Sequence, residues 1–120
     1  MRGIYLLLID VKRNVKVKIG ALGRLEFPKG KYLYVGSAQT NLEKRIERHL
    51  TKRKKKFWHI DYLLCNKFAK VVEIFYKEAK KAEECKTAQT ILRNLGGEPI
   101  LKFGCSDCKC KAHLFRMENL

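Results

Sequence analysis

Residues 34–50, YVGSAQTNLEKRIERHL, decide the fold, because they join the end of a strand to a well-marked helix. From Lys31 to Val35 the sequence alternates with Tyr and Leu as in a half-buried strand, and Gly36-Ser37 is expected to stop it. Thr40 is the predicted N-cap, since Glu43 three residues later completes a capping box. This stretch therefore predicts a strand, a short turn and a helix.

The predicted helix carries two basic side chains on its apolar stripe. Leu42, Ile46 and Leu50 recur every four residues and are expected to pack inward. Arg45 and His49 lie on the same stripe, four residues apart, so their side chains are neighbours at the edge of the buried face. Taken alone, this pattern is that of an amphipathic helix with two basic groups on its polar edge.

A second motif, Gly3-Ile4-Tyr5, opens the apolar run from Ile4 to Val11. A GIY that begins one strand, a YVG that ends a later one and N-L-x-x-R-I-x-x-H-L on a helix resemble, in that order, the GIY-YIG nuclease superfamily. The Cys-containing stretch GCSDCKCKAHLF resembles the small Uri-like branch of that superfamily. The sequence separation of Tyr5 and Tyr34 is wider than is usual there, and an inserted hairpin between the two motifs would account for it.

The resemblance implies a metal-dependent endonuclease that hydrolyses DNA. It makes Tyr5 the catalytic base or its equivalent, Tyr34 a hydrogen-bonding partner, and His49 a proton relay or a phosphate contact. It also implies that a glutamate on a helix holds one divalent metal, Mg²⁺ or Mn²⁺. Glu84 matches this position best, because it stands at the start of the second long helix beside the apolar stripe. Glu83 and Glu73 are the alternatives.

The residue types alone also fit phosphodiester hydrolysis, although they indicate it less specifically than the resemblance does. Phosphodiester cleavage needs an activated water, positive charge on the phosphate and help for the leaving oxygen. The planar fork of Arg45 can give a phosphate two hydrogen bonds, and the carboxylate of Glu84 can hold a Mg²⁺ that keeps most of its waters. A phenol has a pKa near ~10, so Tyr5 would need surrounding positive charge to lower it. Without the resemblance, Tyr5 and Tyr34 are ordinary strand aromatics.

Charge points to a polyanionic partner. The 120 residues contain 27 Lys+Arg and 12 Asp+Glu, a formal net charge of +15, and no segment joins a basic face to a wide apolar one. DNA is therefore the expected partner, RNA is left open, and a partner protein that supplies specificity is a further expectation. No apolar run is long enough to span a membrane, and the opening residues lack the features of a signal peptide. We expect one domain, residues 1–120, in the cytoplasm.

A basic run follows the predicted helix and is expected to form a loop that grips phosphates. The predicted nucleic-acid contacts are Lys52, Arg53, Lys54, Lys55, Lys56 and His59. Like-charge runs are more often simply solvated. For His59, a packing or capping role is as consistent with the pattern as a place in the site.

Five cysteines, an odd number, indicate a reducing compartment rather than a disulfide framework. Cys65 and Cys85 lie within apolar patterns and are interpreted as small buried hydrophobes. A structural zinc could use Cys105, Cys108, Cys110 and His113. It is not favoured, because one short loop struggles to present four ligands tetrahedrally and no second C-x-x-C is present. The expected result is less than one equivalent of zinc and a tolerated Cys105→Ser.

The remaining patterns predict an α+β fold, a small and mostly antiparallel sheet flanked by helices. The predicted elements are a hairpin of Ile4–Asp10 with Val15–Ile19, a short strand at Leu25–Phe27, a short helix around Trp58 to Leu63, a strand at Val71–Tyr76, a helix from Lys80 to Leu95 closed by Gly96-Gly97, and strands at Pro99–Phe103 and Leu114–Met117. The second helix is expected to bury Cys85, Ala88, Ile91 or Leu92, and Leu95.

Two other functions fit parts of the sequence. A non-catalytic nucleic-acid-binding module would keep the fold and the charge but could lose the metal ligand, and this chain retains Glu84 as a candidate. A zinc-stabilised interaction domain would rest only on the segment from Cys105 to His113. The sequence favours the endonuclease.

Overall fold

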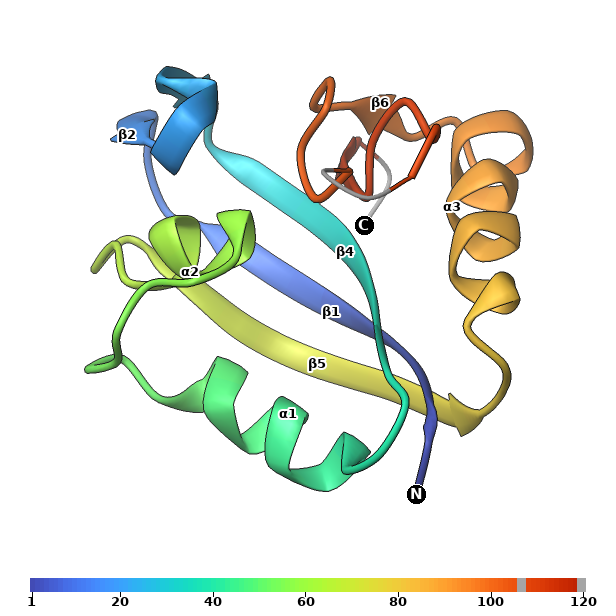
Figure 1. The fold of residues 1–120 in the computed structure, drawn as a ribbon. Coiled ribbons are helices and arrows are strands. Elements are labelled where there is room, and N and C mark those ends of the chain that lie inside the picture. Colours follow the sequence, from blue (N-terminus) through green and yellow to red (C-terminus); the bar gives the residue numbers. More distant parts are fainter. Residues whose placement is uncertain (106–107, 119–120) are drawn as a thin grey trace.

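The computed structural model describes residues 1–105 and 108–118, over which the chain forms a five-stranded antiparallel sheet, a two-stranded hairpin and three α-helices (Figure 1). In chain order the elements are β1 (Gly3–Val11), β2 (Val15–Lys18), a 3₁₀ turn (Gly20–Leu22), β3 (Arg24–Phe27), β4 (Gly30–Ala38), α1 (Leu42–Leu50), α2 (His59–Leu64), β5 (Ala69–Glu78), α3 (Ala82–Asn94), β6 (Glu98–Pro99) and β7 (Leu114–Met117). The predicted α+β class is confirmed. Residues 106 and 107 of the Cys-rich stretch lie outside the described residues.

The strand order is β5-β1-β4-β7-β6, so β1 lies inside the sheet between β4 and β5. Tyr5 on β1 pairs with Gly36 on β4, and Leu7 pairs with Tyr34. The two tyrosine motifs are therefore neighbours across one strand pair. The predicted end of β4 at Gly36 is wrong, because pairing with β1 carries the strand on to Ala38.

The predicted pairing of the first two strands is also wrong. The edges of β1 are occupied by β4 and β5, so β2 pairs instead with β3. Val15 and Val17 on β2 are half-buried and alternate with exposed lysines, a pattern that suits a small hairpin lying over a core. The hairpin expected between the two tyrosine motifs is thus present, with β3 as its second strand.

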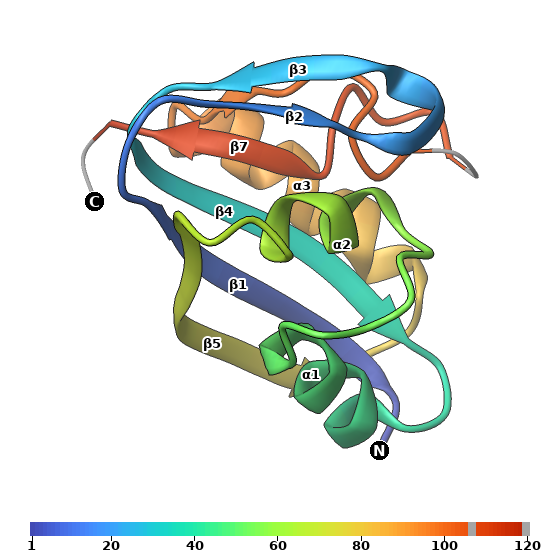
Figure 2. The same ribbon diagram turned by 90° about the vertical axis from the view of Figure 1, so that its left-hand side faces the viewer.

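The sheet separates two apolar layers, because successive residues of a strand point to opposite faces. On one face Tyr5, Leu7 and Ile9 join the larger core, which α1, α2 and the β2–β3 hairpin cover. On the other face Leu6 and Leu8 pack with the layer under α3. The two views in Figures 1 and 2 show these elements on opposite sides of the sheet.

The N-cap of α1 and the burial of its last residue differ from the prediction. Asn41, not Thr40, is the N-cap, and its side-chain oxygen accepts a hydrogen bond from the backbone N–H of Lys44 at 3.0 Å. At the other end His49 is buried, whereas Leu50 is 55% exposed. His49 follows Leu42 by seven residues, which is close to two full helical turns, so both side chains lie on the buried side of α1. Leu50, one residue further, points away from that side.

The second half of the chain follows the prediction except near its end. The strand predicted at Pro99–Phe103 is only β6, after which the chain turns with positive φ at Lys102 and Gly104. Leu95, expected to be buried, is exposed, because it follows the last turn of α3. In the described part of the chain, no helix has the length and apolar character needed to cross a membrane.

Candidate active site

Tyr5 lies against a glycine that its ring requires. A Cβ on Gly36 would overlap the hydroxyl end of the Tyr5 ring, so the glycine of the YVG motif leaves the space that the phenol occupies. The rings of Tyr5 and Tyr34 lie on the same face, with centroids 6.4 Å apart. The sheet therefore fixes both rings at one place.

His49 is the hydrogen-bonding partner of Tyr5. Its Nε2 lies 2.6 Å from the Tyr5 hydroxyl, and both side chains are buried. Burial lowers the pKa of His49 to about 3, so the imidazole is neutral at pH 7. In the tautomer that leaves Nε2 unprotonated, Tyr5 donates this hydrogen bond. Among the described residues, His49 Nδ1 is a buried atom without a hydrogen-bond partner.

The expectation that positive charge lowers the pKa of Tyr5 is wrong. Burial raises the pKa well above that of a free phenol, and the opposing effect of Arg45 is smaller. Burial likewise raises the pKa of Tyr34. Both phenols are thus protonated at neutral pH, and any proton that Tyr5 gives up has His49 as its nearest acceptor.

An open cleft of about 540 Å³ collects the predicted catalytic residues. Tyr5, Tyr34, Arg45 and Glu84 all line it, from β1, β4, α1 and α3. His49 does not line the cleft, but its hydrogen bond to the Tyr5 hydroxyl connects it to a residue that does. The structure therefore brings together four of the five predicted residues directly and the fifth through one hydrogen bond.

Arg45 is held at the cleft by its backbone and aromatic neighbours. Its Nη1 donates to the backbone oxygen of Ser37 at 3.0 Å, and its guanidinium lies 4.2 Å from the centre of the Trp58 ring. Stacking on an indole face fixes the plane of the guanidinium. One of its five N–H donors is used by Ser37, which leaves others for an anion in the cleft.

Glu84 is the one carboxylate among the described residues that line the cleft, and its side chain is 15% exposed. The Ser37 hydroxyl donates to one of its oxygens, and the Nδ1 of His113 lies 3.1 Å from the other. Each oxygen keeps a second lone pair, so Glu84 fits a divalent cation that retains most of its waters. The alternatives Glu83 and Glu73 do not line the cleft, and Glu83 instead pairs with Lys86.

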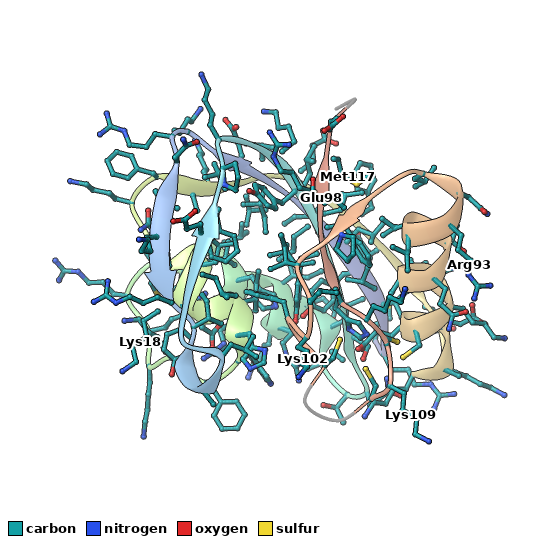
Figure 3. All side chains as sticks on the ribbon, turned by 90° about the horizontal axis from the view of Figure 1, so that it is seen from above. Lys18, Arg93, Glu98, Lys102, Lys109 and Met117 are labelled. Carbon is teal, nitrogen blue, oxygen red and sulfur yellow. The ribbon has the colours of Figure 1, made fainter. Side chains whose placement is uncertain are left out.

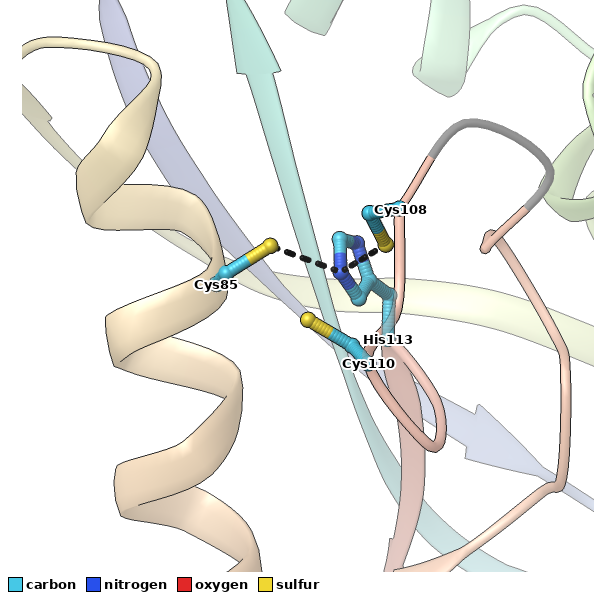
Figure 4. Close-up of side chains that lie close together, drawn as sticks. All are labelled: Cys85, Cys108, Cys110 and His113. Atoms are coloured by element: carbon cyan, nitrogen blue, oxygen red, sulfur yellow. Dashed lines mark hydrogen bonds between the residues drawn. The ribbon is translucent and has the colours of Figure 1, made fainter.

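A cluster of three cysteines and one histidine lies behind Glu84. The ligand atoms of Cys85, Cys108, Cys110 and His113 are all within 4.8 Å of one another, so this Cys₃His cluster can hold a metal ion such as zinc (Figure 4). The argument against zinc is wrong in its premise, because Cys85 on α3 supplies the second segment. Cys85 is only half-buried, so its interpretation as a small buried hydrophobe is wrong as well, and Cys105 is not part of the cluster.

A family model described as a domain of unknown function, DUF123, matches residues 4–120. The chain belongs to this family. No curated protein and no solved structure matched it. The fold and the cleft described above are therefore those of a DUF123 domain.

The basic loop of this DUF123 domain contains two lysines, Lys52 and Lys54, whose ammonium groups donate to backbone oxygens of the domain. Lys52 Nζ donates to the backbone oxygens of Leu64 and Asn66 at 2.7 and 3.0 Å, and the side chain of Lys54, 6% exposed, donates to the backbone oxygen of Arg48. These two cations, predicted to bind phosphates, also hold the loop to the rest of the domain. Arg53, Lys55 and Lys56 are exposed, and nitrogen-tipped side chains surround much of the molecule (Figure 3).

Asp61 holds the other end of that loop, a role that the sequence did not reveal. It is fully buried, accepts two hydrogen bonds from Arg48 at 2.8 and 2.9 Å, and accepts two more from the backbone N–H groups of Phe57 and Trp58. Burial alone would raise its pKa, but these hydrogen bonds outweigh it and the pKa is lowered. Asp61 thereby positions Trp58, on which Arg45 stacks.

Several cleft residues were not predicted. Ser37 near the end of β4 lines it, as do Gln39 and Thr40 in the turn that follows, and Lys81 lines it just before α3. Phe57 also lines it and is 77% exposed. The signal for Phe57 and Trp58 was an aromatic pair directly after a basic run, a composition typical of nucleic-acid binding. His59, a candidate site residue predicted from the sequence, lines the cleft as well, and its Nδ1 accepts a hydrogen bond from the backbone N–H of Gly104 at 2.9 Å.

Proposed function

We propose that this DUF123 protein is a metal-dependent endonuclease that hydrolyses phosphodiester bonds of DNA, as GIY-YIG nucleases do. The observation that carries the proposal is the cleft itself. It gathers two tyrosines, an arginine and a carboxylate from β1, β4, α1 and α3, with His49 behind Tyr5. Such a set combines a proton acceptor, a phosphate ligand and a metal ligand around one space.

The contact between Tyr5 and His49 supports a proton relay. Hydrolysis requires a water to lose a proton as it attacks phosphorus. The phenol oxygen of Tyr5 can take that proton while its own proton passes to Nε2 of His49, 2.6 Å away. The negative charge of a free phenolate is then never formed in this buried site, where burial raises the pKa of Tyr5. The proton instead makes His49 an imidazolium, which burial and the nearby cations disfavour at a pKa of about 3, so the relay depends on the negative charge of the bound phosphate.

Arg45 and Glu84 support the handling of the phosphate charge. Arg45 has N–H donors beyond the one bonded to Ser37, and they can meet the non-bridging oxygens of a phosphate in the cleft. Mg²⁺ or Mn²⁺, when bound, would offset the charge that develops on the phosphate and the leaving oxygen. Glu84 would be its protein ligand, oriented by Ser37 and His113.

The charge and the rim of the cleft support DNA as the substrate. The net charge of +15 favours a polyanion, and the outward cations of the loop, Arg53, Lys55 and Lys56, precede the cleft residue Phe57 in sequence. An exposed aromatic ring next to a catalytic cleft can stack on a base of the bound strand.

All five cysteines are free, which suits a reducing compartment such as the cytoplasm.

The test is cleavage of defined substrates. Supercoiled plasmid, and labelled duplex, branched and single-stranded DNA and RNA, are incubated with the protein in Mg²⁺, in Mn²⁺ and in chelator. We expect metal-dependent nicking of DNA. Arg45→Lys should bind DNA and fail to cut it, because a point charge lacks the planar fork. Binding without cleavage of any substrate would overturn the proposal in favour of a non-catalytic nucleic-acid-binding module.

A further inference from the structure

The Cys₃His cluster has the donor spacing of a tetrahedral zinc site. Zinc bonds of about 2.0–2.3 Å at tetrahedral angles place donor atoms roughly 3.3–3.8 Å apart. His113 Nε2 lies 3.5 Å from the sulfur of Cys108 and 3.9 Å from that of Cys85. Cys110 completes the group. Small movements would therefore let all four atoms bind one ion.

The hydrogen bond of His113 selects the ring form that a metal needs. An ionised carboxylate only accepts hydrogen bonds, so the contact of Glu84 with Nδ1 requires a proton on Nδ1. A neutral His113 then has an unprotonated Nε2, and this is the atom that faces the thiols in Figure 4. A histidine that gives its second N–H to a carboxylate is a recurrent arrangement at zinc sites.

The ligands come from two segments that an ion would join. Cys85 belongs to the first turn of α3, directly after Glu84, and the other three ligands lie in the segment that enters β7. Figure 3 shows sulfur atoms gathered between α3 and this segment. The segment has little regular secondary structure near the cluster, so an ion would fix it to the helix that carries Glu84.

We propose that Cys85, Cys108, Cys110 and His113 bind one structural zinc ion, and that this ion, through the Nδ1–H of His113, holds the carboxylate of Glu84 in the cleft. The zinc site rests on the cluster alone. Its action on Glu84 rests on the proposed function, in which Glu84 is the ligand of the catalytic metal. His113 is then a positioning residue that couples two metal sites.

The first measurement is the metal content of the full-length protein, purified with reduced thiols. Elemental analysis is expected to give one zinc per chain. Cys85→Ser and Cys110→Ser should lose it, whereas Cys65→Ser and Cys105→Ser, which change cysteines outside the cluster, should keep it. Wild-type protein with substantially less than one equivalent, or retention of zinc by both cluster variants, would overturn the site.

A spectroscopic titration decides the matter if the cluster variants do not fold. Wild-type protein is stripped with chelator under reducing conditions and titrated with Co²⁺. We expect saturation at one equivalent, with thiolate-to-cobalt charge-transfer bands and the intense visible bands of a tetrahedral ion. Weak octahedral bands, or no saturation, would contradict the proposal, and so would a disulfide within the cluster of the native protein.

The second measurement is the affinity of Mn²⁺ for Glu84, which needs no substrate. Mn²⁺ prefers oxygen ligands, and binding that disappears in Glu84→Ala is assigned to the cleft. Removal of zinc should weaken this binding about 10–100-fold, the usual effect of losing a partner that orients a metal ligand. His113→Cys should weaken it similarly while keeping zinc, since a thiolate replaces the imidazole as ligand but cannot bond Glu84.

The outcomes separate the two proposals. Equal Mn²⁺ affinity in zinc-loaded and zinc-free protein would overturn the coupling, whatever the nuclease assays give. If His113→Cys does not keep zinc, the comparison of loaded with zinc-free wild type decides. If the zinc-loaded wild type has no Mn²⁺ binding that depends on Glu84, the coupling and the catalytic role of Glu84 both fail, while the zinc content still decides the zinc site.

Discussion

Removal of the Tyr5 hydroxyl separates catalysis from folding, because the chain offers a matched control. The hydroxyl of Tyr5 contacts His49 Nε2 at 2.6 Å, and that of Tyr32 donates to the backbone oxygen of Pro28 at 2.7 Å. Both rings belong to the same core, and burial raises the pKa of both phenols. Of these two tyrosines, only Tyr5 lines the cleft. Tyr5→Phe and Tyr32→Phe therefore remove comparable atoms from different places.

The stability costs follow from the hydrogen bonds that each variant loses. Tyr32→Phe removes an ordinary hydrogen bond and should lower the free energy of unfolding by about 0.5–1.5 kcal/mol. Tyr5→Phe leaves His49 Nε2 without a partner, and since His49 Nδ1 already lacks one, the cost should reach about 1–3 kcal/mol. In a domain of this size, each kcal/mol lowers Tm by about 4 °C. Both variants should remain folded at 25 °C.

The catalytic costs should differ far more. Loss of a general base or relay slows a reaction by about 10²–10⁴-fold, so Tyr5→Phe should be almost inactive, and Tyr32→Phe should cleave at nearly the wild-type rate. The assay is single-turnover cleavage of the preferred DNA, with DNA affinity and thermal unfolding measured on the same preparations. If folded Tyr5→Phe cleaves as fast as Tyr32→Phe, the Tyr5 hydroxyl has no essential part and the relay is wrong.

Two further predictions concern charge. DNA affinity should fall steeply with salt, with a slope of about −0.9 in log K against log[salt] for each phosphate contacted. Replacing Arg53, Lys55 and Lys56 by Gln should flatten the slope, whereas Lys52→Gln should lower Tm and leave the slope unchanged. A salt-insensitive affinity would contradict the proposed binding. The free energy of unfolding should fall as the pH drops from about 6.5 towards 3. In this window His49 becomes protonated in the unfolded chain but not in the folded chain, where its pKa is about 3. A His49→Gln variant with the same pH dependence would refute this cause.

Local patterns predicted the elements better than their partners. Alternation and spacing placed β1, β4, α1 and α3 within a few residues, because each pattern is a property of consecutive residues. The partner of β1 depends on segments far along the chain, and a short turn made β2 look like its neighbour. The extension of β4 past Gly36 likewise follows from the pairing of Ser37 and Ala38 with Ile4 and Gly3 on β1, which no local pattern contains.

The same difference between local patterns and long-range contacts holds for the site residues. The motif order identified Tyr5, Tyr34, Arg45 and Glu84, which line one cleft. Partners that arise only from tertiary contacts were missed, such as the bond of Ser37 to Glu84. Residue type also does not reveal which backbone groups a side chain will bind. Lys52 looks like a phosphate ligand, but its ammonium binds backbone oxygens.

The cluster around His113 illustrates the limit of spacing most clearly. Three ligands follow one another closely in sequence, so the motif looked like an isolated loop with Cys105 as its fourth member. The fold instead brings Cys85 from α3 beside them. A helical cysteine within an apolar pattern carries no local sign of a ligand.

The cleavage rate of Glu84→Ala relative to Glu83→Ala tests the central claim most directly. Both variants remove a carboxylate from the first turn of α3, but only Glu84 lines the cleft, while Glu83 pairs with Lys86 in solvent. Mg²⁺-dependent, single-turnover cleavage is measured at saturating DNA, after binding has been shown to be intact in both. We predict wild-type cleavage by Glu83→Ala and none by Glu84→Ala. Full Mg²⁺-dependent activity in Glu84→Ala would contradict the account of this site.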